Sequence, residues 1–275
     1  MPLPARFTKM AGGGNDFLVF EADGRALTPA DRERLSRLCR RGLSVGADGA
    51  LFLSRGEEGR LRLDYFNADG GLASFCANGT RCAARYAARH GLVSGDPVLE
   101  TGWGPIAARV DSRSVTLRLP PVPVSGEELP IWGDDLPPSG TPLQVGVPHL
   151  IIFVKGDLAA LPIERLAPPL RRHPDLPEGA NVHFVKVEGP NRVAVRSFER
   201  GVEGETLACG SGVVASAVAA ARQGRVVPPV VCMTKGGASF TVAFTSGAGP
   251  TEDAELTGDA REIFSGDLNE EAWQE

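Results

Sequence analysis

The sequence predicts a mixed α/β protein built from two similar domains related by a pseudo-two-fold axis. Three observations predict this fold class: a length of 275 residues, a match of the chain with itself at about half that length, and a proline-rich stretch between the matching halves. Domains average roughly 100–200 residues, so two of them fit this length. We place the first domain at residues 1–120 and the second at residues 121–262.

The internal match occurs at an offset of 132–133 residues and keeps the same order of segments. The apolar run Phe17–Phe20 corresponds to Leu150–Val154, and the run Arg60–Phe66 corresponds to Arg192–Phe198. Apolar and polar residues alternate in the second pair, which is typical of β-strands. A duplicated chain of this kind predicts two like-folded domains with a ligand-binding cleft between them.

The elements follow from local patterns in chain order. Apolar Leu35 and Leu38 among charged residues predict an amphipathic helix, which we expect as an extra element of the first half. Prolines crowd the stretch between residues 120 and 142, which excludes a central strand or a helix interior and marks the domain boundary. The expected elements are the helix Pro29–Arg40, the strands Leu63–Phe66 and Val193–Phe198, and the alanine-rich helices Thr80–His90 and Gly212–Arg222, which end at Gly91 and Gly224.

Composition and charge exclude several classes of function. The net charge is −5, from 29 basic and 34 acidic residues, which argues against a nucleic-acid partner. No apolar run reaches the roughly 18 residues of a membrane span, and the N-terminal residues lack the apolar stretch of a signal peptide. We therefore expect a cytoplasmic protein, in which the five cysteines stay reduced.

Each half places one cysteine just before its alanine-rich helix, Cys76 in the first half and Cys209 in the second. A helix N-terminus has up to four N–H groups without an intrahelical partner and carries about half a positive charge. We therefore expect a lowered pKa for both thiols. The same N–H groups are expected to bind a carboxylate.

Two thiols on opposite sides of one cleft suit the inversion of a weak carbon acid. One thiolate removes the proton next to a carboxylate, and the facing thiol returns a proton from the other side. Helix N–H groups would stabilise the developing enediolate, and a site that excludes water would assist the step. The predicted chemistry is a two-base racemisation or epimerisation of an amino acid.

Other interpretations of the cysteines carry less support. Cys39, Cys82 and Cys232 lie in apolar periodic segments and are expected in the core. A redox pair of Cys76 and Cys209 is weaker, because 133 residues separate them and no C-x-x-C motif is present. A zinc site is weaker still, because no further Cys or His lies at ligand spacing, so we expect no metal.

The motifs around the two cysteines resemble those of the diaminopimelate epimerase family, and the likeness runs over essentially the whole chain. The segments that carry it are Gly14–Phe17, Gly46–Gly49, Phe66–Gly70, Cys76–Gly79, Pro148–His149, Asn181–Val182, Glu199–Gly201 and Glu205–Gly212. The resemblance implies two α/β domains, each a curled sheet around a central helix, with residues 263–275 packing back on the first domain. It implies a cofactor-free, pyridoxal-independent enzyme that interconverts LL- and meso-diaminopimelate for lysine and cell-wall synthesis. It also implies a homodimer.

Position by position, the resemblance assigns Cys76 and Cys209 as the acid/base thiols, with His149 and Glu199 beside the thiols and the substrate ammonium group. No motif supports a role for His90, His173 or His183, which we assign to the surface or the core. The remaining implied residues are substrate-binding: Asn15, Asn67, Ala77, Asn78, Asn181, Glu199, Arg200, Gly210 and Ser211. Of these, Arg200 suits a distal carboxylate because its planar guanidinium can bind one through two hydrogen bonds.

The sequence departs from the family pattern at Ala11, Ala77 and Val147, where the family has His, Gly and Asn. Val147 matters most, because valine cannot donate a hydrogen bond to the far end of the substrate. A pyridoxal-independent racemase of another amino acid therefore stays open. So do a non-catalytic amino-acid-binding protein and a dinucleotide-binding protein, the latter because Gly210–Ala215 fits G-x-G-x-x-A, although a poor strand precedes it.

Overall fold

The computed structural model describes residues 3–123, 126–133, 136–245, 247, 249–251 and 253–273. The chain divides into two compact units. Unit 1 consists of Met1–Leu117 with Gly258–Glu275, and unit 2 of Arg118–Thr257. The C-terminal segment of unit 1 therefore begins at residue 258, five residues before the segment 263–275 that was expected to pack on the first domain.

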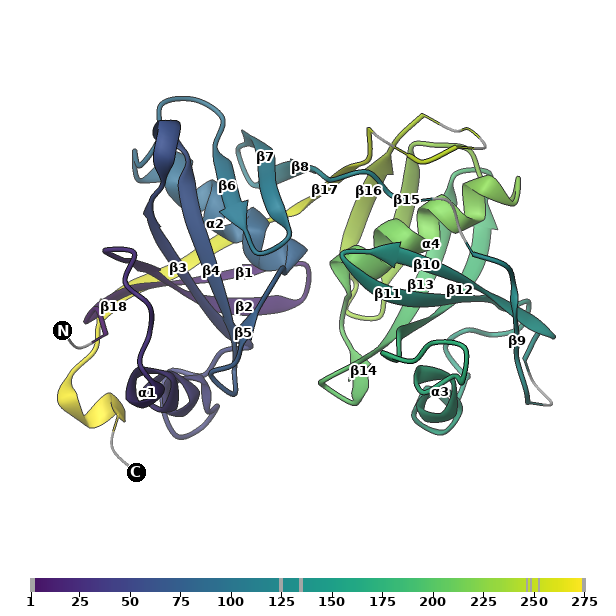
Figure 1. Ribbon diagram of the computed structural model, residues 1–275, viewed down its shortest axis with the longest axis horizontal. Coiled ribbons are helices and arrows are strands. Elements are labelled where there is room, and N and C mark those ends of the chain that lie inside the picture. The colour runs from purple at the N-terminus through teal and green to yellow at the C-terminus, as the bar shows by residue number, and fades with distance from the viewer. Residues whose placement is uncertain are drawn as a thin grey trace. The chain divides into compact units, whose positions relative to one another are not determined.

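Unit 1 combines a mixed sheet with the α-helices α1 and α2 (Figure 1). Its C-terminal strand pairs antiparallel with the first strand, Arg6 facing Asp267, so both ends of the described chain lie in one sheet. The elements are β1 (Arg6–Gly12), β2 (Asn15–Glu21), α1 (Pro29–Cys39), β3 (Gly49–Arg55), η1 (Glu57–Gly59), β4 (Leu61–Asn67), β5 (Leu72–Ala73), α2 (Ala77–Arg89), β6 (Val98–Thr101), β7 (Gly104–Asp111), β8 (Ser114–Arg118), β18 (Arg261–Asp267) and η2 (Glu270–Trp273).

Unit 2 repeats this order of strands and helices. The short strand β9 is added near its start, and β17 crosses its limit at Thr257 and runs on into unit 1 along the chain. The elements are β9 (Leu129–Pro130), β10 (Ser139–Val145), β11 (Val147–Phe153), α3 (Ile163–Arg171), β12 (Asn181–Gly189), β13 (Arg192–Glu199), β14 (Gly204–Thr206), α4 (Gly210–Arg222), β15 (Val230–Thr234), β16 (Ser239–Ala243) and β17 (Glu255–Asp259).

The strand pairings of the two units are equivalent. β2 pairs parallel with β3, and β11 pairs parallel with β12, in the same register: Phe17 faces Gly49 and His149 faces Asn181. β3–β4 and β12–β13 are both antiparallel, and β4–β6 and β13–β15 are both parallel. The internal repeat of the sequence is thus a repeat of topology.

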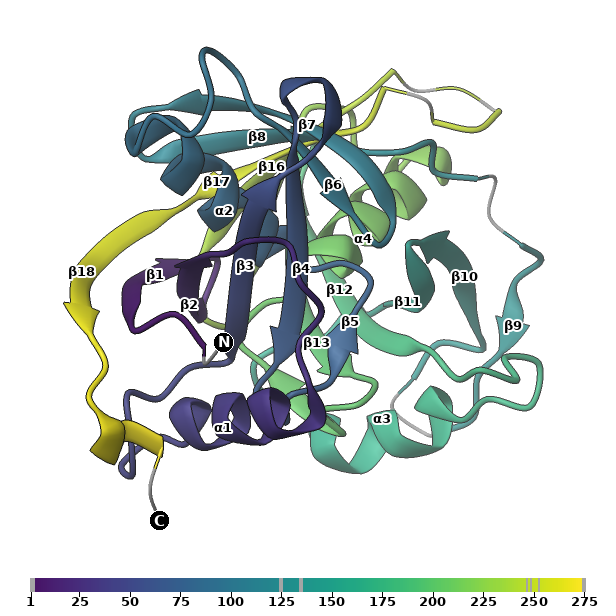
Figure 2. The ribbon, with the colours of Figure 1, turned by 60° about the vertical axis from the view of Figure 1, so that its left-hand side comes forward.

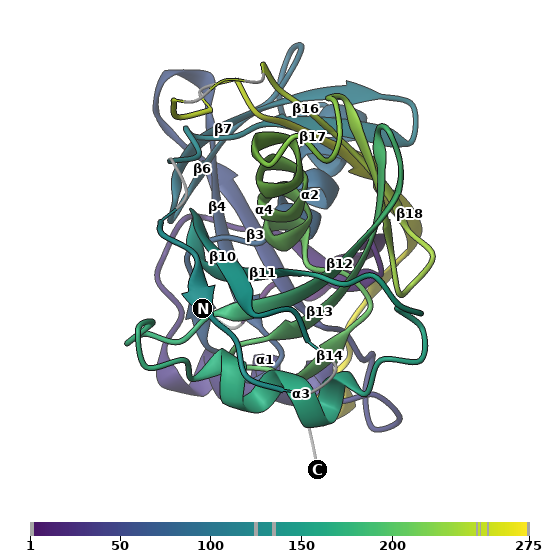
Figure 3. The same cartoon turned by 90° about the vertical axis from the view of Figure 1, so that its right-hand side faces the viewer.

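Each sheet curls around one helix and carries the other helix on its outer face (Figures 2 and 3). α2 contacts β1, β2, β3, β4, β6 and β7, and α4 contacts β10, β11, β12, β13, β15 and β16. On the outer face of the unit 1 sheet, Leu35 and Leu38 of α1 pack against Leu18, Phe20 and Phe52. Because both faces are covered, the central strands are apolar runs, as buried parallel strands usually are.

Several predicted boundaries differ from the structure. The helices begin at Ala77 and Gly210, earlier than predicted, so that Cys76 and Cys209 occupy the N-cap positions. Gly91 and Gly224 follow the helix ends with positive φ, as predicted. The prediction that only the first half has an amphipathic helix is wrong, because α3 takes the place of α1 in unit 2. Pro168 and Pro169 inside α3 hid it from sequence analysis, since proline usually ends a helix.

Among the residues that the structure describes, no helix has the length and apolarity that crossing a bilayer would require.

Candidate active site

Cys76 caps the N-terminus of α2. Its Sγ accepts the N–H of Gly79 at 3.4 Å, and the residue is partly exposed. The first turn of α2 packs closely on β3, because a Cβ at Gly79 would lie 2.9 Å from Leu51 Cδ2.

Asn78 and Asn15 form a polar network next to Cys76. The Asn78 side-chain N–H donates to Asn15 Oδ1 at 2.7 Å, and Asn15 donates in turn to Asp48 at 3.0 Å. Fully buried Arg81, one turn further along α2, donates to Asn78 Oδ1 at 2.6 Å. Burial alone would raise the pKa of Asp48, but hydrogen bonds from Asn15 and the Asp16 N–H hold it below its ordinary value.

Cys209 caps α4 in the equivalent position of unit 2, but its surroundings differ. The side chain is 5% exposed, and Sγ lies 3.8 Å from the Ser211 hydroxyl. Burial raises the pKa of the Cys209 thiol well above its ordinary value, and the charge of Glu199 raises it further. The prediction of a lowered pKa is therefore wrong for Cys209, because desolvation outweighs the helix N-terminus.

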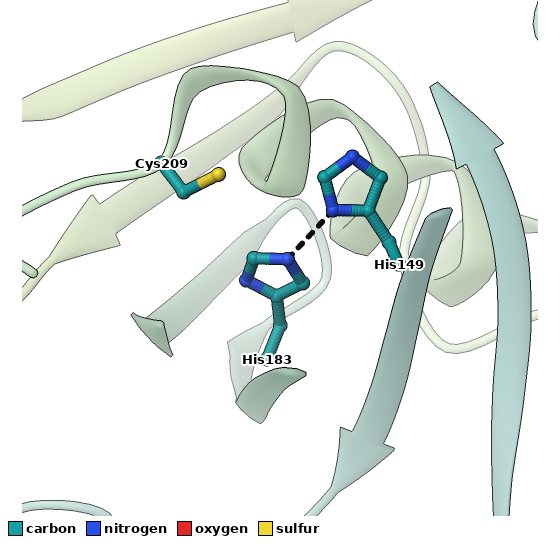
Figure 4. Close-up of side chains that lie close together, drawn as sticks. All are labelled: His149, His183 and Cys209. Atoms are coloured by element: carbon teal, nitrogen blue, oxygen red, sulfur yellow. Dashed lines mark hydrogen bonds between the residues drawn. The ribbon is translucent and has the colours of Figure 1, made fainter. Parts of the chain in front are cut away.

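Two buried histidines lie beside Cys209, and its side chain is directed toward them (Figure 4). His149 Nδ1 and His183 Nε2 are 2.8 Å apart, His183 Nδ1 is 2.8 Å from the Ser197 hydroxyl, and His149 Nε2 is 3.4 Å from the Val145 carbonyl oxygen. Burial lowers the pKa of His149 to about 4 and the pKa of His183 well below its ordinary value. Both imidazoles are thus neutral near pH 7.

His149, His183 and Cys209 also form a group that could hold a metal ion, since one ligand atom of each lies within 4.8 Å of the others. The facing nitrogens of the two histidines already share a hydrogen bond. The group therefore satisfies its polar atoms without a cation.

A second polar group lies at the ends of β12 and β13. Asn181 Oδ1 accepts the backbone N–H of Arg200 at 2.8 Å, and the Arg200 guanidinium donates to the Glu178 carbonyl at 2.9 Å. The Glu199 carboxylate accepts the Thr206 hydroxyl at 2.6 Å. Asn181 faces His149 in the register of β11 and β12, so this group adjoins the histidines.

The remaining predicted site residues have fewer contacts with the polar groups around Cys76 and Cys209. Asn67 ends β4 in an exposed turn, where its N–H donates to Gly71 at 2.9 Å, apart from the Asn78 network. Ala77, Gly210 and Ser211 form the first turns of α2 and α4, whose first N–H groups face away from intrahelical acceptors. Of the departures from the family pattern, Ala11 faces Asp16 in β1–β2, and Val147 begins β11.

Sequence analysis missed His183, Ser197 and Arg81. His183 was assigned to the surface or the core without a role. It is buried, but this assignment is incomplete because His183 is hydrogen-bonded to His149. A signal was present: His183 lies two residues after Asn181 in a strand, hence on the same face. Arg81 carries no signal in the sequence, since its burial depends on the tertiary fold.

Comparison with solved structures identifies the fold. A probable proline racemase from Agrobacterium radiobacter K84 matches with a TM-score of 0.72 and 13% identity, over 96% of this chain and 93% of that one. A hydroxyproline epimerase from Agrobacterium vitis matches with a TM-score of 0.69 and 17% identity, over 96% and 92%. The chain has the fold of these racemases and epimerases, with a cysteine at the start of each central helix.

Sequence comparison identifies the family. The model of the diaminopimelate epimerase family matches residues 7–114 and 142–252. The diaminopimelate epimerase of Methanothrix thermoacetophila is 37% identical over 98% of this chain and 97% of its own length, and that of Aquifex aeolicus is 34% identical over 96% and 98%. The chain belongs to the diaminopimelate epimerase family and is an isomerase, which confirms the resemblance of its motifs.

Proposed function

We propose that this chain interconverts LL- and meso-2,6-diaminopimelate by proton transfer between two cysteines and the substrate α-carbon. The observation that carries the proposal is one cysteine at the N-cap of the central helix of each unit, in a chain of this family. Neither cysteine is bonded in a disulfide. Each unit would supply one of the two bases.

The two cysteines have different resting roles in this proposal. Cys209 is a thiol at rest, because burial raises its pKa. Cys76 Sγ accepts the Gly79 N–H at a helix N-terminus, an environment that favours negative charge. Cys76 thiolate therefore takes the α-proton, the electron pair of the C–H bond moves toward the substrate carboxylate, and the Cys209 S–H delivers its proton to the opposite face.

The remaining residues bind the substrate. The first N–H groups of α2 and α4, at Ala77, Asn78, Gly210 and Ser211, suit the carboxylate next to the reacting carbon. His149 and Glu199 adjoin the reacting end, as their contacts with Cys209 support. Asn15, Asn67, Asn181 and Arg200 would hold the distal amino-acid group through charged and amide hydrogen bonds.

The test is α-proton exchange in deuterated water. LL-diaminopimelate should give meso product with deuterium on the inverted carbon, and Cys76→Ser or Cys209→Ser should each lower kcat by about 10²–10⁴. Glu33→Ala, a change on the exposed face of α1 and outside the proposed site, serves as the control and should leave kcat unchanged. Exchange with proline, glutamate or histidine but none with diaminopimelate would overturn the assignment, and an unchanged kcat in both cysteine variants would overturn the mechanism.

The second candidate is a racemase of another amino acid, which the departure at Val147 favours. Val147 begins β11 as Asn15 begins β2, so the first unit keeps an asparagine where the second has none. Val147→Asn restores the family residue. If diaminopimelate is the substrate, this variant should keep or lower KM with little change in kcat, and a loss of activity on a different amino acid would favour the second candidate.

Two further proposals follow from the family. We propose a homodimer, which light scattering of the purified chain would measure. β18 pairs with β1 and leaves Ile263 and Phe264 about half exposed, at 52% and 49%, on a strand that could meet a second copy. We also propose a cytoplasmic location, because the mechanism requires that both cysteines stay reduced. Cell fractionation tests this location.

A further inference from the structure

The inner faces of the two sheets differ at three equivalent positions. In unit 1, Phe17 packs edge-on against Tyr65, with centroids 6.0 Å apart, and Leu51 lies between them in the register. In unit 2 the corresponding residues are His149, His183 and Ser197, which are joined by hydrogen bonds. The correspondence, at an offset of 132 residues, is Phe17 with His149, Leu51 with His183 and Tyr65 with Ser197.

The direction of the hydrogen bonds that join His149, His183 and Ser197 follows from the groups at the two ends of this series. A carbonyl oxygen only accepts, so His149 must donate to Val145 from Nε2. Neutral His149 then has a lone pair on Nδ1, and His183 must donate to it from Nε2. His183 in turn has its lone pair on Nδ1, which accepts the hydroxyl proton of Ser197.

The opposite direction is disfavoured by the same contacts. If His149 carried its proton on Nδ1, its Nε2 lone pair would face the Val145 carbonyl oxygen, two acceptors without a proton between them. The Ser197 hydroxyl would also have to give its proton to another acceptor. Only the first arrangement gives each polar atom of His149, His183 and Ser197 a hydrogen-bond partner.

We propose that His183, held by Ser197, is a positioning residue that places the proton of His149 on Nε2. Resting His149 then has a proton and not a lone pair on Nε2, and its Nδ1 lone pair is engaged by His183, so neither ring nitrogen is a free base. Acceptance at Nδ1 strengthens the donor at Nε2, because hydrogen bonds in a chain polarise one another. The inference about the resting protein is independent of the proposed substrate; only its kinetic consequence depends on the proposed function.

Packing holds His183 in the required orientation. Gly212, in the first turn of α4, lies against the His183 ring so closely that a Cβ there would overlap it. His183 is fully buried, and Ser197 is 2% exposed. The ring therefore has little freedom to turn away from His149, and burial keeps both imidazoles neutral.

Nitrogen NMR of the imidazoles tests the proposal directly, since the chain has four histidines. We expect His149 and His183 to be neutral at pH 7 with the proton on Nε2. His183→Leu, which introduces the residue of unit 1, should shift the His149 Nδ1 resonance, and His183→Gln should restore it because its amide can donate. His173→Leu removes a buried histidine that is not hydrogen-bonded to His149 or His183, and it should leave the His149 resonances unchanged.

Kinetics provides the second readout. His183→Leu and Ser197→Ala should lower kcat by about tenfold with KM nearly unchanged, and His183→Gln and Ser197→Thr should recover most of it. A charged His149, or one with its proton on Nδ1, would overturn the inference whatever the activity. So would an unchanged His149 spectrum and kcat in folded His183→Leu. The expected spectrum in a protein inactive toward diaminopimelate would instead overturn the proposed function alone.

Discussion

Cys76 and Cys209 occupy the same position of the repeat, yet their surroundings give them different properties. Cys76 is partly exposed, and Cys209 is buried beside two neutral histidines. A helix N-terminus acts on both sulfurs, but desolvation acts fully on only one. A chain duplicated in sequence can therefore leave one of its helix-capping thiols partly exposed and bury the other, whose pKa is raised.

Asn78 has a structural role as well as a proposed binding role. It is 2% exposed, and its Oδ1 accepts from the fully buried Arg81 guanidinium. Hydrogen bonds to charged groups contribute about 1.5–3 kcal/mol, so Asn78→Ala should lower the free energy of unfolding by about 2 kcal/mol, measured by urea denaturation.

Asn67→Ala is the matched control, because Asn67 is exposed and should change the unfolding free energy by less than about 0.5 kcal/mol. Equal effects of the two substitutions would mean that Arg81 does not depend on Asn78. The unfolding free energy of Asn78→Ala also shows whether any loss of activity in this variant arises from loss of folding.

At the scale of elements, the sequence predicted the repeat of strands and both central helices. These signals are local: alternation in β4 and β13, alanine-rich helices, and glycines with positive φ after them. It did not predict α3, because Pro168 and Pro169 contradict helical propensity and only packing against β12 and β13 offsets them. The spacing of His183 from Asn181 was a usable signal, but the pairing of His183 with His149 depends on the parallel register of β11 and β12, which the sequence does not give.

The starts of α2 and α4 pack against different residues, which gives a matched pair of substitutions. Gly79→Ala would bring a Cβ 2.9 Å from a flexible leucine methyl, whereas Gly212→Ala would meet the hydrogen-bonded His183 ring. Replacing glycine by alanine in a helix contributes up to about 1 kcal/mol, which offsets a small clash but not a large one.

Gly212→Ala should therefore lower the unfolding free energy by about 1–3 kcal/mol relative to Gly79→Ala, measured by thermal and urea denaturation. Combining Gly212→Ala with His183→Ala should recover part of the loss, because the ring that is overlapped is then absent. A larger loss for Gly79→Ala would show that the first turn of α4 can shift while that of α2 cannot.

At the scale of the whole molecule, the two units share a topology and differ in what lies inside one of their sheets. The neutral buried histidines of unit 2 make folding depend on pH. The pKa of His149 falls from 6.5 to about 4 on folding, so the unfolded chain binds more protons between these values and stability must rise with pH across them. The loss on going from pH 6.5 to pH 4 is about 3 kcal/mol for this group, and His183 acts in the same direction.

The double variant His149→Phe with His183→Leu carries the residues of unit 1 and should lose most of this slope. Unfolding free energies of both proteins, measured between pH 4 and 7, check it; carboxyl groups titrate in both and cancel in the difference. Parallel curves for the two proteins would mean that the histidines are charged in the folded state.

The proposed mechanism requires that both units bring their sulfurs to one carbon, and oxidation tests this requirement. Sulfurs that close on one carbon can approach to disulfide distance when substrate is absent, whereas Cys39, Cys82 and Cys232 are buried separately. Mild oxidation with diamide should abolish activity, and dithiothreitol should restore it. Mass spectrometry should find a Cys76–Cys209 peptide pair, saturating substrate should slow its formation, and neither single serine variant should form it. Full activity in a protein shown to carry this bond, or a failure to form it while the reduced protein remains active, would mean that the two thiols do not meet across one reacting centre.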